Sequence, residues 1–173
     1  MPMILVTPLS AIEDMIRLYR PSHMITLLSP EHMIETPEGI EAARHLKLGL
    51  NDVSVIEESL DPPTERHVAE LVEFGRGWNA KAPMLIHCWA GVSRSMAGAY
   101  TLLCDRFPGR EREIAQAIRF RAPHAWPNAL MVRYADAILQ RKGRMVEAVE
   151  EIGRGLLVVE GECVELPLSL EEL

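Results

Sequence analysis

The chain has 173 residues, of which 48% are hydrophobic, 25% charged and 5% aromatic. At about 150 residues per domain, this length predicts one domain that buries a full core without disulfides. Ordinary glycine and proline contents exclude fibrous and low-complexity proteins, and no apolar run approaches the roughly 20 residues that span a bilayer. The composition therefore predicts a cytoplasmic globular protein with no membrane partner.

The net charge of −7 is unevenly distributed along the chain. Residues 144–173 hold two Arg and eight Glu, whereas residues 1–143 hold 16 basic and 17 acidic side chains. We therefore expect a nearly neutral domain over residues 1–143, followed by an acidic C-terminal appendage over residues 144–173 that packs on or extends the same domain.

Short apolar runs alternate with helical patterns along the chain. Strands are predicted at residues 3–7, 23–29, 45–50 and 83–88. Helices are predicted at residues 10–20, 64–78, 95–104, 111–120 and 129–141, with a last amphipathic stretch at 145–152. Ser10 and Glu13 have the spacing of a capping box that starts the first helix. Residues 30–43 indicate a loop or short helix, and residues 156–168 alternate as an extra hairpin or an extended strand.

This order of elements predicts a three-layer α/β/α fold with a central, mostly parallel sheet of four or five strands. The three cysteines, Cys88, Cys104 and Cys163, are odd in number and widely spaced. Their spacing predicts neither a disulfide framework nor a zinc site. The basic residues between 106 and 142 lack the density of a nucleic-acid-binding surface. We therefore expect no metal and no nucleic-acid partner.

Residues 87–95 read His-Cys-Trp-Ala-Gly-Val-Ser-Arg-Ser and lie between a buried strand and a helix. Sites in parallel α/β sheets form at such junctions. The N–H groups of the loop and of the helix N-terminus can bind an oxyanion such as phosphate or sulfate, and they also stabilise a thiolate at Cys88. Arg94 offers a planar fork to two phosphoryl oxygens. Gly91 permits the sharp curvature of the loop, and the Ser95 hydroxyl can donate to the sulfur.

The combination of His87, Cys88, Gly91, Arg94 and Ser95 at these spacings resembles the signature of the cysteine-dependent protein tyrosine phosphatase superfamily. It is most similar to the compact dual-specificity-like branch, including bacterial tyrosine phosphatase-like proteins. The resemblance extends over roughly residues 1–143. It implies a phosphate-binding loop (P-loop) between the strand that ends at the cysteine and the next helix.

The resemblance also implies roles for individual residues. Cys88 would form a phosphocysteine intermediate, Ser95 would assist its breakdown, and His87 would orient the loop. The phosphate would be bound by Arg94 and by the backbone of Trp89, Ala90, Gly91, Val92, Ser93 and Arg94. This chemistry needs no metal and no organic cofactor.

The general acid is expected to be an Asp some thirty residues before the cysteine. Asp52 lies 36 residues before Cys88, at the end of a predicted strand, and Asp61 lies 27 residues before it. Capping of the following helix explains Asp61 without catalysis, so we favour Asp52 and keep Asp61 as the alternative. Asn128, in a Pro-Asn pair before a helix, would either support the P-loop or act only as an N-cap.

The variable positions of the loop, occupied by Trp89, Ala90, Val92 and Ser93, carry no charge. This composition disfavours highly anionic head groups and favours phosphotyrosine or a similar aryl monoester. We expect a protein tyrosine phosphatase with dual-specificity potential, acting on phosphorylated proteins or small phosphomonoesters. The alternative is a phosphate-binding pseudophosphatase or adaptor that recognises phosphorylated partners without hydrolysing them.

Overall fold

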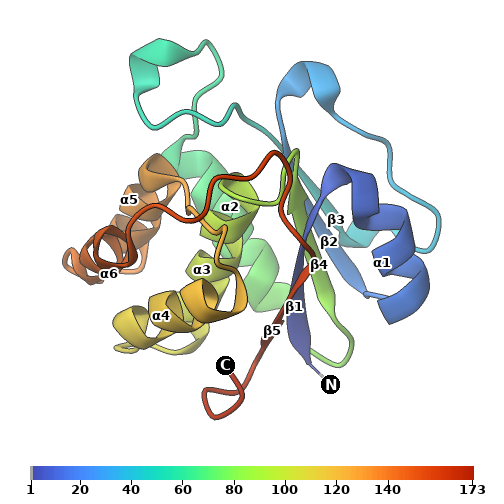
Figure 1. The fold of residues 1–173 in the computed structure, drawn as a ribbon. Helices are drawn as coiled ribbons and strands as arrows, with labels where there is room; N and C mark the ends of the chain where they lie inside the picture. The colour runs from blue at the N-terminus through green and yellow to red at the C-terminus, as the bar shows by residue number, and fades with distance from the viewer. Residues whose placement is uncertain (1) are drawn as a thin grey trace.

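A single mixed β-sheet forms the centre of the molecule in a computed structural model that describes residues 2–173 (Figure 1). Its strand order is β3-β2-β4-β1-β5. The strands are β1 (Met3–Pro8), β2 (His23–Leu28), β3 (His45–Gly49), β4 (Met84–Cys88) and β5 (Val164–Pro167). The first four run parallel, and β5 pairs antiparallel with β1. The predicted α/β fold with a mostly parallel sheet is confirmed.

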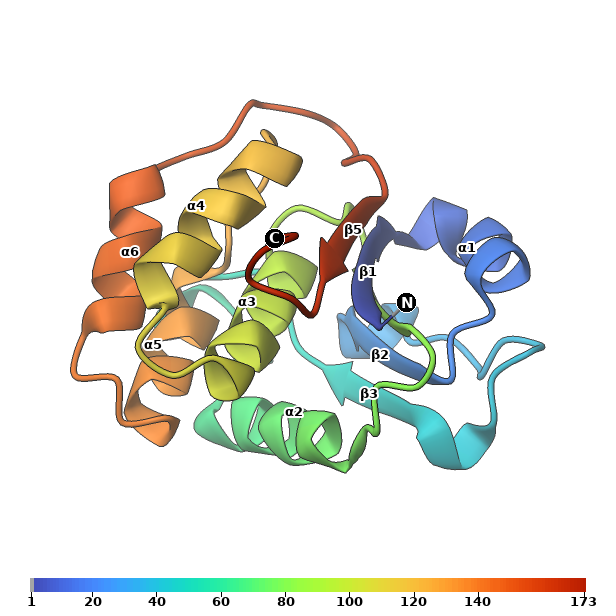
Figure 2. The ribbon, with the colours of Figure 1, turned by 90° about the horizontal axis from the view of Figure 1, so that it is seen from below.

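The helices cover both faces of this sheet (Figure 2). They are α1 (Ile12–Tyr19), α2 (Glu65–Gly77), α3 (Arg94–Arg106), α4 (Glu111–Arg121), α5 (Ala129–Ile138) and α6 (Arg144–Ile152). Four 3-10 turns are η1 (Leu9–Ala11), η2 (Pro30–His32), η3 (Ala42–Arg44) and η4 (Ile56–Glu58). Helix α1 lies on one face and the other helices on the opposite face. None of the helices described in residues 2–173 is long and apolar enough to cross a membrane.

Successive side chains of each strand point to opposite faces of the sheet, so the hydrophobic core is divided between these two faces. In β4, Met84 and Ile86 belong to the large cluster that packs under helices α2 to α6. Leu85 between them belongs to a smaller cluster with Ile12 and Ile16 of α1. Because both faces are covered, the strand is buried along its whole length and ends at the buried Cys88.

Two expectations about helix starts are wrong. Helix α1 begins at Ile12 rather than at a capping box on Ser10, whose hydroxyl instead donates to Glu160 at 2.6 Å. Helix α2 begins with a capping box made by Thr64 and His67, so capping does not account for Asp61. For Ser10 the deciding partner is distant in sequence, whereas for α2 the cap is Thr64, three residues after Asp61.

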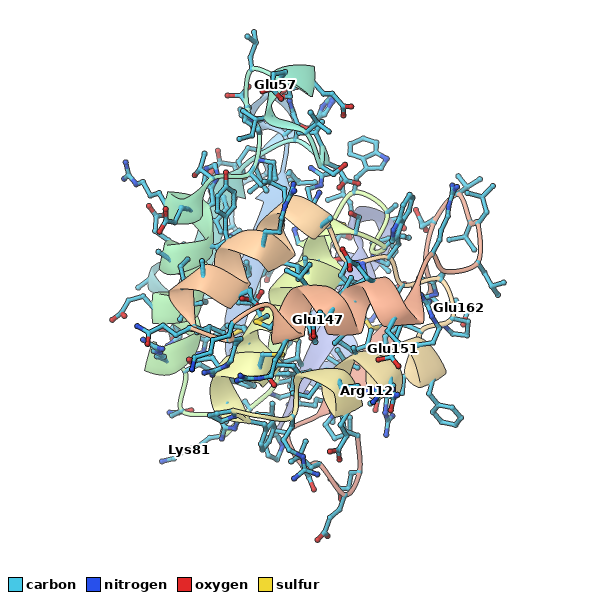
Figure 3. All side chains as sticks on the ribbon, turned by 90° about the vertical axis from the view of Figure 1, so that its left-hand side faces the viewer. Glu57, Lys81, Arg112, Glu147, Glu151 and Glu162 are labelled. Atoms are coloured by element: carbon cyan, nitrogen blue, oxygen red, sulfur yellow. The ribbon has the colours of Figure 1, made fainter. Side chains whose placement is uncertain are left out.

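The C-terminal residues are built into the same layers. Helix α6 packs against α4 and α5, and the carboxylate of Asp136 accepts the N–H groups of Gly143 and Met145 at the start of α6. Arg112 of α4 and Glu151 of α6 form an ion pair between the two helices (Figure 3). Beyond α6 the chain crosses to β5 without regular structure, so within residues 156–168 the expected strand is limited to β5 and no hairpin forms.

Candidate active site

The centre of the candidate site is the thiol of Cys88 at the carboxyl end of β4. The residue is 2% exposed. Its sulfur lies 3.1 Å from the hydroxyl oxygen of Ser95 and accepts the backbone N–H of Gly91 at 3.3 Å. Helix α3, which begins at Arg94, adds its N-terminal dipole. The sulfur therefore lies among groups that present partial positive charge toward it.

The backbone of residues 88–94, here called the P-loop, is fixed by bonds that its carbonyl groups make outward. Three neighbouring segments supply the donors. The bonds run from Leu9 N–H to Trp89 O (3.1 Å), Gly161 N–H to Ala90 O (2.7 Å), Trp126 N–H to Val92 O (2.9 Å) and Asn128 N–H to Ser93 O (3.2 Å). With these carbonyls bonded to neighbouring segments, the loop's N–H groups are available to a ligand at its centre, and the N–H of Gly91 already donates to the Cys88 sulfur. Such a ring of amides is an anion-binding nest.

Gly91 is the residue that permits this curvature. Its φ of +71° lies in the left-handed region. A Cβ atom on it would lie 2.8 Å from the backbone nitrogen of Pro8 and 2.9 Å from the carbonyl carbon of Thr7. Both the dihedral angle and the close approach of β1 therefore require glycine at this position.

Arg94 provides a buried positive charge that has no carboxylate partner in residues 2–173. The side chain is 7% exposed. Its Nη1 donates to the carbonyl of Leu50 at 2.9 Å, whereas its Nε is buried and has no hydrogen-bond partner within the described chain. A buried guanidinium is costly unless an anion balances it. The cavity beside Cys88, which Arg94 lines, is where that anion would bind.

Asp52, the favoured acid, lies at the rim of the P-loop. Its Oδ1 accepts the hydroxyl of Ser93 at 2.7 Å and the amide Nδ2 of Asn128 at 2.9 Å. Asn128 is also the N-cap of α5, where its Oδ1 accepts the N–H of Met131 at 3.0 Å. Asp61 is exposed and does not line the cavity, although its carbonyl accepts the N–H of Asn51.

A chain of hydrogen bonds runs beneath the P-loop across three strands. His87 Nδ1 lies 3.1 Å from the carbonyl oxygen of Cys88, and His87 Nε2 lies 2.8 Å from the hydroxyl of Thr26. The same hydroxyl lies 2.7 Å from His45 Nε2, and His45 Nδ1 lies 2.9 Å from the hydroxyl of Thr36. Burial lowers the pKa of both His87 and His45 to about 4, so both imidazoles are neutral near pH 7.

Because both imidazoles are neutral, the donor and the acceptor of every hydrogen bond in this series are fixed. A carbonyl only accepts, so His87 Nδ1 carries the proton and donates to Cys88. His87 Nε2 then accepts from Thr26, whose oxygen accepts from His45 Nε2. His45 Nδ1 in turn accepts from Thr36. The arrangement gives each of these polar atoms a partner and ties the carbonyl of Cys88 to the sheet.

A cavity of about 460 Å³ opens above Cys88 and Arg94. Trp89 is half exposed at its edge, with its ring centroid 5.2 Å from that of His32. Sequence reasoning missed several residues that line this cavity: His124, Trp126, Arg154, Leu156, Leu157 and Val158. The first two adjoin the Pro-Asn pair that was singled out. No local signal marks the others.

Comparisons with known proteins identify the fold but not a close relative. No protein-family model matches the sequence, and no curated protein matches it. Among solved structures, DUSP15 is 18% identical with a TM-score of 0.65, covering 87% of this chain and 92% of DUSP15. A human tyrosine phosphatase-like serine/threonine/tyrosine-interacting protein is 19% identical with a TM-score of 0.66, covering 82% and 94%.

PTPMT1 in complex with PI(5)P is 17% identical with a TM-score of 0.56, covering 85% of this chain and 88% of PTPMT1. These similarities extend over most of each chain. The chain therefore has the fold of the compact dual-specificity phosphatases, within the architecture of the cysteine-dependent protein tyrosine phosphatases.

Proposed function

We propose that this protein hydrolyses phosphomonoesters through a phosphocysteine intermediate and that phosphotyrosine in proteins is its main substrate. The observation that carries the proposal is the pairing of a buried thiol with the buried, unbalanced guanidinium of Arg94 at one cavity. A tetrahedral dianion would accept from the Nε of Arg94 and from the loop amides, and it would bring phosphorus to the sulfur of Cys88.

In the first step the Cys88 thiolate would attack phosphorus, forming the S–P bond as the P–O bond to the leaving group breaks. The leaving oxygen would take a proton from the carboxyl group of Asp52. In the second step Asp52 would accept a proton from the water that attacks phosphorus, and the S–P bond would break to release inorganic phosphate. The Ser95 hydroxyl, 3.1 Å from the sulfur, would stabilise the departing thiolate.

The contacts of Asp52 suit the role of acid and base. Both of its side-chain hydrogen bonds go to Oδ1, from Ser93 and Asn128, which leaves Oδ2 to carry the transferred proton. The same bonds hold the carboxyl group at the rim of the P-loop, where a leaving oxygen would emerge.

Neither a metal nor an organic cofactor is needed for these steps. The reaction does need Cys88 as a free thiolate, which a reducing compartment such as the cytoplasm would maintain. The uncharged loop positions favour an aryl monoester over a polyanionic head group. Because PTPMT1 was solved with PI(5)P, a phosphoinositide belongs in the substrate panel as a competitor.

The test is release of phosphate from p-nitrophenyl phosphate and a phosphotyrosine peptide, with and without a chelator. We expect turnover that the chelator does not reduce. Cys88→Ser should abolish turnover and still bind substrate, and Arg94→Lys should reduce kcat/KM at least 100-fold because the bidentate contact is lost. Cys104→Ala is the control for loss of another buried thiol and should remain active. Turnover by Cys88→Ser would refute the covalent mechanism.

Asp52→Ala and Asp61→Ala separate the two candidate acids. With aryl phosphates of graded leaving-group pKa, the true acid variant should lose most activity on the poorest leaving group. We expect this pattern for Asp52→Ala and near-normal kinetics for Asp61→Ala. The reverse pattern would assign the acid to Asp61. Tight binding of phosphopeptide by the wild-type chain without any turnover would instead indicate an adaptor.

A further inference from the structure

Exposed large hydrophobic side chains are concentrated on the chain segments that line the cavity. In residues 2–173, nine of the eleven lie on four segments that also line the cavity, whereas Leu18 and Phe120 lie on helices α1 and α4. The nine are Val55, Ile56, Leu60, Trp89, Trp126, Leu156, Leu157, Val158 and Val159. Five of these nine, Trp89, Trp126, Leu156, Leu157 and Val158, line the cavity itself. Exposed apolar side chains that share one cavity, rather than lying singly on the surface, mark a binding site.

The C-terminal part of this surface is a strap, residues 153–161, that is fixed at both ends. At its start Arg119 donates to the carbonyls of Gly153 and Pro123 at 2.7 and 2.8 Å. The N–H of Leu156 also donates to Pro123, at 2.9 Å. At its end the N–H of Gly161 donates to Ala90 of the P-loop at 2.7 Å. The strap crosses from α6 toward β5 (Figure 1).

A close packing contact holds the far end of the strap in place. A Cβ atom on Gly161 would lie 2.6 Å from Nε2 of His124, so the backbone there is pressed against a cavity-lining side chain. Between the two ends, Leu156, Leu157 and Val158 form part of the cavity wall. They are 67%, 84% and 40% exposed, so the fold itself does not bury them and a ligand could.

We propose that this wall recognises apolar side chains next to the phosphorylated residue of a peptide substrate, with Leu156 and Leu157 as specificity-determining residues. The inference rests on the proposed function, because it takes the phosphate to lie at Cys88 and Arg94. Trp126, whose ring lies 4.6 Å from the guanidinium carbon of Arg154, forms another part of the same wall. A cavity of about 460 Å³ is much larger than one phosphate, which leaves room for neighbouring side chains.

Charge favours a peptide over an anionic membrane. Glu57 and Glu58 adjoin Ile56 at the tip of the projecting loop, and Glu160 and Glu162 flank the far end of the strap (Figure 3). With a net charge of −7, these carboxylates repel an anionic lipid surface and also disfavour acidic residues in the peptide. The expected ligand is a phosphopeptide with apolar and few acidic neighbours.

Binding is measured by fluorescence anisotropy in the Cys88→Ser background, so the result does not depend on turnover. Labelled phosphotyrosine peptides carry leucine, serine or glutamate on both sides of the phosphorylated residue. We expect the leucine peptide to bind about tenfold more tightly than the serine peptide, and the glutamate peptide to bind most weakly. Leu157→Ser should reduce the leucine preference about fivefold, and Leu156→Ser should act in the same direction.

Val159→Ser is the matched control, because Val159 is on the same strap and 98% exposed but does not line the cavity. Leu18→Ser controls for a distant exposed side chain. Equal affinities for the three peptides, or a loss of preference as large in Val159→Ser as in Leu157→Ser, would overturn the proposal. So would binding to neutral phosphatidylcholine vesicles through Leu157, which would indicate a membrane instead. Hydrolysis of p-nitrophenyl phosphate by the wild type reports separately on the proposed function.

Discussion

Replacing Thr26 by valine tests the hydrogen-bond chain beneath the P-loop. Thr26 lies in the middle of this series of hydrogen bonds, with its hydroxyl oxygen 2.7 Å from His45 Nε2 and 2.8 Å from His87 Nε2. Valine keeps the β-branched shape that suits a central strand, so the substitution removes the hydroxyl and little else. Both imidazole Nε2 atoms then lose their partner.

The expected cost follows from the burial of the two imidazoles. His87 is 0% exposed and His45 is 9% exposed, so little water can replace the lost hydroxyl. Each buried polar atom left without a partner costs about 1–3 kcal/mol. Allowing for local relaxation, we expect Thr26→Val to lower the free energy of unfolding by about 3 kcal/mol. The total free energy of unfolding of a domain of this size is about 5–15 kcal/mol.

The assay is urea unfolding at pH 7, followed by circular dichroism. Thr101→Val is the matched control, because Thr101 is also fully buried but its hydroxyl donates only to the Ala97 carbonyl within its own helix, at 2.7 Å. That loss should cost less than about 1 kcal/mol. Equal destabilisation by the two variants would show that the chain of bonds has no special role. We also expect Thr26→Val to reduce kcat, because His87 would no longer be held against the Cys88 carbonyl.

Three further predictions concern the same loop and the strap. Because the pKa of His87 is about 4 in the folded chain and about 6.5 when unfolded, the unfolded state binds the proton first. Protonation of His87 should therefore lower the free energy of unfolding by about 3 kcal/mol as pH drops from about 6.5 to about 4, and His45, whose pKa is also about 4, should add a similar amount. The fall in urea midpoints should be smaller in His87→Gln by the His87 share. Gly91→Ala should abolish phosphatase activity, whereas Gly109→Ala, also at positive φ but in open space, should only lower stability by about 1–2 kcal/mol. Arg119→Met should speed proteolysis within the strap, and unchanged cleavage rates would show that Arg119 does not anchor it.

The sheet and most helices could be predicted because their apolar patterns are local. The run Met84-Leu85-Ile86 reads as a strand buried on both faces, and the structure has it as β4. The P-loop could be predicted because its chemistry is contiguous in sequence. Helix starts were less predictable: Ser10 has the right spacing for a cap, yet its hydroxyl binds Glu160, 150 residues away. Spacing rules do not include such distant competitors.

The contacts around Asp52 show a second limit of sequence reasoning. Asp52, Ser93 and Asn128 were each singled out, but for separate reasons. Ser93 and Asn128 both donate to the same carboxylate oxygen of Asp52, although they lie 41 and 76 residues after it in the sequence. Only the meeting of three chain segments at the carboxyl edge of the sheet reveals that the candidate acid is held by the loop it would serve.

The strap shows a third limit, which has a physical cause. The alternation over residues 156–168 predicts an extra hairpin or an extended strand, because a hydrophobic pattern alone does not distinguish a strand from the wall of a binding cavity. In the structure Leu157 is 84% exposed at the cavity, and only Val164–Pro167 pairs with β1.

The predicted domain (residues 1–143) and the predicted C-terminal appendage (residues 144–173) both contribute residues to the cavity. This arrangement couples recognition of a peptide to the P-loop. The N–H of Gly161 in the strap donates to the carbonyl of Ala90, and this is one of the four hydrogen bonds that hold the carbonyl groups of the P-loop. The cavity wall that would contact the substrate therefore lies on the same segment as a hydrogen bond that supports the P-loop. A strap displaced by a poorly fitting peptide would also loosen the Ala90 carbonyl, whereas a well-fitting apolar peptide would hold both in place. Apolar contacts remote from the phosphate should therefore raise kcat as well as affinity.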